Sequence, residues 1–121
     1  MERFEVPRDK EVDYWEKYME PSGDIRKDTL YLYGVDYLNT KKILEYFNYF
    51  SPGKVEWLND TSCNVVFPSD DNALEALNTN CIEKINPEAF ENIKRPALGY
   101  RLNDEVMPMY IRFSTIGVNF M

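Results

Sequence analysis

Four residues, spread over three parts of the chain, have side chains that could together bind a strand of RNA. Tyr31 and Tyr33 stand two positions apart, so a β-strand would present both rings on the same face. Such rings stack on nucleic-acid bases, while Arg112 could pair with phosphate and the amide of Asn64 could hydrogen-bond a base edge. Structural alternatives stay open, because the tyrosines could simply cover the sheet and Asn64 could be a solvated strand residue.

The sequence offers little material for catalysis. It has no histidine, which removes the commonest general base and the commonest metal ligand. Cys63 and Cys81 lack the spacing of metal ligands, and there is no glycine-rich phosphate loop. The neighbouring carboxylates Asp70 and Asp71 are better explained as the start of a helix. We therefore expect a protein that is not an enzyme and that holds no metal or cofactor.

The charge balance argues against a protein that holds a long nucleic-acid backbone. The 121 residues carry a formal net charge of −7, whereas such affinity comes from lysines and arginines that displace counterions. Any RNA ligand should therefore be a small feature. The length suits one domain, and a hydrophobic fraction of 44% is ordinary for a globular protein.

Alternating apolar residues predict four strands, and apolar residues at helical spacing predict two helices between them. The strands are expected at 29–35, 54–58, 62–67 and 109–115, with an irregular passage before the last strand. Asn39 or Thr40 is expected to cap the first helix, and Asp70 the second. The order β-α-β-β-α-β is that of the ferredoxin-like fold, an α+β class with a four-stranded antiparallel sheet. Right-handed crossovers would put both helices on one face of the sheet and leave the other face open. Leu30 and Leu32 would then face the core.

Three segments are expected along the chain. Residues 1–28 form an N-terminal extension with an extra short helix at 9–20, in which Trp15 lies on the apolar side. Residues 29–115 form the domain, and residues 116–121 form a C-terminal tail. The short helix would be marginal by itself, so it either packs on the domain or binds a partner.

The predicted sheet resembles an RNA-recognition motif only in part. The run 30–35 resembles the shorter signature of that motif, with Tyr31 at its stacking position. The longer signature begins with a basic residue and places two aromatic rings on the third strand. Here Asp60 stands at its first position, and Ser62 and Asn64 stand where the rings belong. The resemblance implies the fold, but with the usual mode of RNA binding weakened.

A longer run around the second and third strands carries a more specific resemblance. The sequence 57–67 is similar to the Trp-Leu-Asp-Asp-Thr-Ser-Cys-Asn-Val-Val segment of the nuclear cap-binding protein subunit 3 family. The first strand with the Gly-Val-Asp that ends at Asp36 resembles the opening of that family's domain. Segments 95–97 and 111–115 resemble its closing part, so that the resemblance covers roughly 29–115.

The resemblance implies a module that binds the 7-methylguanosine cap of mRNA through Trp57, Leu58, Asn59 and Asp60. The implied partners are capped mRNA and the large subunit of the nuclear cap-binding complex, with a role in mRNA processing and export. The resemblance implies the nucleus as the location, with the cytoplasm as a second one, and a monomer outside the complex. No membrane contact is expected. The family has aspartate where Asn59 stands, so one carboxylate of its motif is missing here.

The chemistry of the cap suits an acidic, aromatic site. A 7-methylguanine is positively charged, which favours stacking on electron-rich rings, and its N1–H and N2–H groups suit a carboxylate acceptor. Asp60 is the expected acceptor. The expected stacking rings are Trp57, Tyr31 or Tyr33, and the expected cations for the triphosphate are Arg112 and Lys54.

Two of these roles have structural alternatives. Trp57 shares the strand phase of Val55, which belongs in the core, so its ring either stacks on the cap or packs in the fold. Asp60 either accepts hydrogen bonds from the cap or serves the turn, where aspartate is favoured. The alternative function is an RNA-recognition-motif-like module for protein interaction that has lost direct RNA binding.

Overall fold

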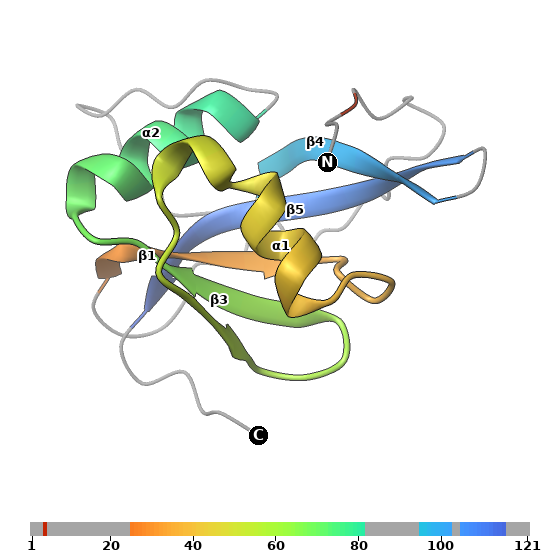
Figure 1. Cartoon of the computed structure of the whole chain (residues 1–121), viewed down its shortest axis with the longest axis horizontal. Helices are drawn as coiled ribbons and strands as arrows, with labels where there is room; N and C mark the ends of the chain where they lie inside the picture. The colour runs from red at the N-terminus through yellow and green to blue at the C-terminus, as the bar shows by residue number, and fades with distance from the viewer. Residues whose placement is uncertain (1–3, 5–24, 82–94, 103–104, 116–121) are drawn as a thin grey trace.

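The computed structural model describes residues 4, 25–81, 95–102 and 105–115, which form five strands, two α-helices and a 3-10 helix (Figure 1). In chain order these are β1 (Ile25–Tyr33), α1 (Thr40–Tyr46), η3 (Asn48–Phe50), β2 (Lys54–Trp57), β3 (Ser62–Val66), α2 (Asp70–Asn80), β4 (Arg95–Leu102) and β5 (Glu105–Thr115). The extra helix expected at 9–20 lies outside the described residues. In the described ranges, no helix is long and apolar enough to cross a membrane.

The strands form one antiparallel sheet in the order β2-β3-β1-β5-β4. At its centre, Leu30 pairs with Val65 of β3 on one side and with Phe113 of β5 on the other. Both helices pack on the face that carries these three side chains (Figure 1). The prediction of an α+β fold is therefore confirmed.

The core lies between the helices and this face of the sheet. Leu30 and Leu32 are 0% and 1% exposed, as the alternation of the first strand predicted. Phe47, directly after α1, meets the ring of Phe67 edge-on, with 5.6 Å between centroids and 86° between planes. The other buried apolar side chains of this core include Val35, Ile43, Cys63, Val65, Ala73, Leu77, Met109, Ile111 and Phe113. Burial of this apolar surface is the main favourable contribution to folding.

Side-chain caps define where the two helices begin. The Oδ1 of Asn39 accepts a hydrogen bond from the backbone N–H of Lys42 at 2.9 Å, so the cap of α1 is Asn39, one of the two expected residues, and not Thr40. The cap of α2 is Ser69, whose hydroxyl accepts from the N–H of Asn72, so the prediction of Asp70 as the cap is wrong. Asp70 lies instead in the first turn, where its negative charge interacts favourably with the positive end of the helix dipole.

The prediction of four strands is wrong, because part of the passage expected to be irregular forms β4. This strand lies at the edge of the sheet and pairs only with β5 among the named strands. Proline is tolerated in an edge strand such as β4, because a residue there can lack an N–H without breaking a hydrogen bond of the sheet, and Pro96 is such a residue. The register also shifts between Ala97 and Tyr100, which interrupts the alternation by which a strand is recognised in sequence. Gly99 adds two backbone hydrogen bonds to Phe4.

Candidate functional site

The turn between β2 and β3 is held by the side chain of Asn59. Its Oδ1 accepts hydrogen bonds from the N–H of Thr61 at 2.8 Å, the N–H of Ser62 at 2.9 Å and the hydroxyl of Ser62 at 3.0 Å. Asparagine and aspartate are both favoured in such turns because either supplies an oxygen acceptor. The turn thus requires an acceptor at this position and does not require a charge.

The same turn is tied to the loop that joins β1 to α1. The carbonyl of Thr61 accepts hydrogen bonds from the backbone N–H groups of Gly34 at 2.8 Å and Val35 at 3.0 Å. Gly34 has a φ of 95°, and a Cβ there would lie 2.8 Å from the carbonyl oxygen of Pro108. Only glycine fits that backbone and that space without strain. The loop therefore lies beside the turn, although α1, η3 and β2 separate them in the sequence.

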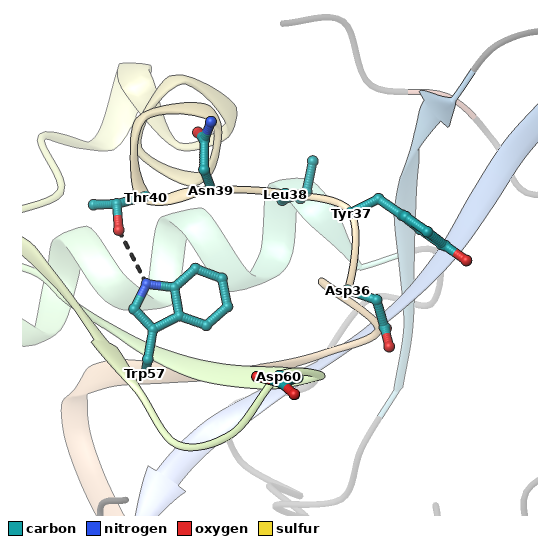
Figure 2. Close-up of a pocket in the computed structure, with 7 residues that line it drawn as sticks. All are labelled: Asp36, Tyr37, Leu38, Asn39, Thr40, Trp57 and Asp60. Atoms are coloured by element: carbon teal, nitrogen blue, oxygen red, sulfur yellow. Dashed lines mark hydrogen bonds between the residues drawn. The ribbon is translucent and has the colours of Figure 1, made fainter.

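Trp57, at the end of β2, closes the space between the turn and the start of α1. Its indole Nε1–H donates to the hydroxyl oxygen of Thr40 at 3.0 Å (Figure 2). The ring is half-buried and packs against the edge of the core, on the face of the sheet that carries the helices. The two roles considered for Trp57 are therefore compatible, because one part of the ring packs in the fold and another part lines a pocket.

That pocket has a volume of about 680 Å³ and lies between the loop and the turn (Figure 2). It is lined by Asp36, Tyr37, Leu38, Asn39, Thr40, Trp57 and Asp60. Two of these residues are carboxylates, and no lysine or arginine is found among the described residues that line it. A smaller pocket of about 310 Å³ lies over Trp57, Leu58, Asn59 and Asp60 themselves. The site is thus acidic and partly aromatic, which suits a flat cation.

The four residues of the hairpin motif have different positions. Trp57 and Asp60 line the larger pocket together, and the side chain of Asp60 is exposed. Leu58 is buried at 5% exposure, so it mainly stabilises the hairpin. Asn59 is exposed, but its oxygen is used by the turn.

The other predicted site residues lie on the opposite face of the sheet. Tyr31 pairs with Asn64 of β3 and with Arg112 of β5, and none of them points to the helices. The guanidinium carbon of Arg112 lies 4.1 Å from the centroid of the Tyr31 ring, and burial lowers the pKa of this arginine. Tyr33 has its centroid 6.3 Å from that of Tyr110. One ligand cannot contact this set and the pocket at Trp57 together, because the sheet lies between them.

This second face was expected to be open, and the structure differs. Ser62, Asn64 and Tyr110 are 1%, 0% and 3% exposed. Polar groups on this face also pair with each other, since Arg26 and Glu56 form an ion pair with 3.2 Å between Nη1 and Oε1. Bases that stack on a sheet need exposed rings and unpaired cations. The face therefore resembles a second packed layer more than an RNA platform.

The residues that sequence reasoning missed are those of the β1–α1 loop. Asp36, Tyr37 and Thr40 line the pocket, but no local periodicity marks a loop as part of a site. One signal was available, because the Gly-Val-Asp that ends at Asp36 is part of the family resemblance. Its position beside the turn depends on long-range backbone hydrogen bonds, which no local pattern encodes.

Sequence comparison with known proteins identifies one family. The family model described as nuclear cap-binding protein subunit 3 matches residues 5–115. Proteins named nuclear cap-binding protein subunit 3 are 40% identical over 75 residues in Gallus gallus, 43% over 53 residues in Homo sapiens and 51% over 43 residues in Xenopus tropicalis. These matches cover 62%, 44% and 36% of the chain, but only 11%, 8% and 7% of the relatives. The chain thus spans a small part of the length of the relatives it matches.

Proposed function

The chain belongs to the nuclear cap-binding protein subunit 3 family, and on this premise we propose that it binds the 7-methylguanosine cap of mRNA in the pocket beside Trp57. The observation that carries the proposal is the half-buried indole of Trp57, which is held by Thr40 in a pocket with carboxylates and without cations from the described residues. A methylated, positively charged guanine can stack on this ring, and a neutral or anionic ligand gains less there.

Asp60 supplies the acceptor for the base. Its exposed carboxylate makes no hydrogen bond or ion pair with the part of the chain that the structure describes, so both oxygens remain available. The Watson–Crick edge of guanine has two N–H donors, N1–H and N2–H, that suit one carboxylate. Hydrogen bonds to a charged group contribute about 1.5–3 kcal/mol each, and less where water competes. Trp57 and Asp60 are thus the proposed ligand contacts.

Asn59 is compatible with cap binding although the family motif has aspartate there. Three donors from Thr61 and Ser62 already use the Oδ1 of Asn59. An aspartate oxygen would serve the same donors, so the change conserves the turn. We propose a structural role for Asn59 and for the buried Leu58.

The strand order of the sheet supports a relation to the RNA-recognition motif. Strands β2, β3, β1 and β5 are adjacent in that order, which is the order of an RNA-recognition motif, and β4 is an added edge strand. Tyr31, Tyr33, Asn64 and Arg112 then form a packed layer on the second face. Under this proposal they stabilise the domain and do not contact the cap.

The relatives' name describes a subunit of a nuclear cap-binding complex. We extend this to the chain as a proposal, in which it associates with the large subunit of that complex in the nucleus and acts in mRNA processing and export. The net charge of −7 agrees with recognition of a cap and not of a long RNA backbone.

Calorimetric titration with 7-methylguanosine triphosphate and with GTP tests the proposal. The protein should prefer the methylated nucleotide by at least about tenfold, and Trp57→Ala should lose most of that preference, because stacking on one ring contributes ~1–3 kcal/mol. Tyr49→Ala is the matched control, since Tyr49 is an aromatic residue that is 84% exposed and does not line the pocket. Equal affinity of the unmodified protein for the two nucleotides would refute cap binding.

A second function, a module for protein interaction without RNA binding, is favoured by the covered second face of the sheet. It predicts that the large subunit of the cap-binding complex retains the unmodified chain and the Trp57→Ala variant equally well. It also predicts that 7-methylguanosine triphosphate does not change the amount retained. Because the first function includes the same association, the pull-down is combined with the titration above: retention by the large subunit without any binding of 7-methylguanosine triphosphate identifies the interaction module.

A further inference from the structure

We infer that Asp36, in the loop between β1 and α1, is a second carboxylate of the pocket and a determinant of its preference for a cationic base. The inference rests on the proposed function and deepens it. The pocket receives Asp60 from the hairpin and Asp36 from a loop that is distant in sequence. The hairpin motif has one carboxylate fewer than the family's motif, because Asn59 stands in place of an aspartate. Asp36 supplies a second negative charge to the pocket.

Backbone hydrogen bonds hold the two carboxylates close to each other. Thr61, whose carbonyl accepts from the N–H groups of Gly34 and Val35, directly follows Asp60. Asp36 directly follows Val35, so each carboxylate is one residue from this junction. In Figure 2, Asp36 and Asp60 lie at the same end of the pocket, away from the Thr40 hydroxyl that binds the indole.

The loop that carries Asp36 is anchored on both sides. The hydroxyl of Tyr100, a residue of β4 that is 2% exposed, donates to the carbonyl of Gly34 at 3.2 Å. After Asp36, the N–H of Leu38 donates to the carbonyl of Val35 at 3.0 Å, which closes a turn around it. An anchored carboxylate loses less conformational entropy when it meets a ligand than one on a mobile loop.

The charges around the indole favour a cation over a neutral ring. Asp36 and Asp60 are both exposed, and neither has an ion-pair partner among the described residues. A cationic base stacked on Trp57 would lie close to both carboxylates and be attracted by them. Unmethylated guanine has no net charge, so the carboxylates do not attract it in this way. At ~5 Å and a dielectric constant of about 50–80, one such charge changes affinity by about 3- to 10-fold. The methyl group is thus recognised through the charge that it places on the base.

The test compares 7-methylguanosine with guanosine, because nucleosides lack the phosphates that would repel the carboxylates. Asp36→Asn removes the charge and conserves the shape, and Asp60→Asn does the same on the hairpin. Glu75→Gln is the matched control, since Glu75 is exposed on α2 and does not line the pocket. Each titration is paired with a melting curve, and Asp36→Ser repeats the test with a different neutral side chain.

We expect Asp36→Asn to lower the preference for the methylated nucleoside by about 3- to 10-fold, with Glu75→Gln unchanged. The preference of the unmodified protein should also fall as salt is raised, and should fall less in the Asp36 variants. A preference that is present in the unmodified protein and equal in Asp36→Asn and Glu75→Gln overturns the inference and leaves cap binding standing. No preference in the unmodified protein refutes the proposed function itself.

Discussion

Variants of Asn59 test which residues of the hairpin stabilise the fold and which bind the ligand. In Asn59→Ala the N–H and hydroxyl of Ser62, a residue that is 1% exposed, lose their acceptor, while the N–H of Thr61 is exposed and can bind water. Two hydrogen bonds from this buried residue, at about 1 kcal/mol each, give a loss of about 2 kcal/mol in the free energy of unfolding. For a domain of this size that corresponds to a fall in Tm of roughly 6–12 °C.

Asn59→Asp is the matched variant, because one carboxylate oxygen can accept the same three hydrogen bonds. We expect its free energy of unfolding to stay within about 0.5 kcal/mol of the unmodified protein. Asn59 does not line the larger pocket, and its side-chain oxygen is held by the turn, so a charge at this position should change the affinity for 7-methylguanosine by less than about 3-fold. Urea unfolding and calorimetric titration measure the two quantities. An unchanged Tm in Asn59→Ala would refute the role of Asn59 in the turn. A gain above ~10-fold in Asn59→Asp would show that a carboxylate at this position acts on the ligand.

Two further predictions concern the scaffold. Gly34→Ala should lower the free energy of unfolding by about 2 kcal/mol or more in a urea titration, because its φ of 95° and the 2.8 Å approach of a Cβ to Pro108 leave no room; a loss below ~0.5 kcal/mol would contradict the geometry. Burial raises the pKa of the Cys63 thiol from 9.0 to about 12 and that of the Tyr100 hydroxyl from 10.0 to about 12. Both groups stay neutral in the fold at a pH where the unfolded chain ionises, so their contribution is complete below pH 9 and is lost as the pH rises to 12. A Tm that stays constant from pH 8 to 11 would refute this.

The sequence by itself determined the strand phases and most of the core. The alternation of apolar residues placed Leu30 and Leu32 in the core, because every second side chain of a strand points to the same face of the sheet. It also placed the hairpin, since only three residues separate the predicted strands, and it limited the cap of α1 to Asn39 or Thr40. The carboxylate and the indole of the motif were predicted as site residues, and both line the pocket.

Only the tertiary structure decided which residues face one ligand. Tyr31 and Trp57 were equal candidates in sequence, yet the pairing of β1 with β3 and of β3 with β2 puts them on opposite faces of the sheet. Asp36 joins the pocket because Thr61 binds the backbone of Gly34 and Val35, a contact between distant segments. Local periodicity reports which side of its own element a residue occupies. It carries no information on which elements become neighbours, because that depends on packing of the whole chain.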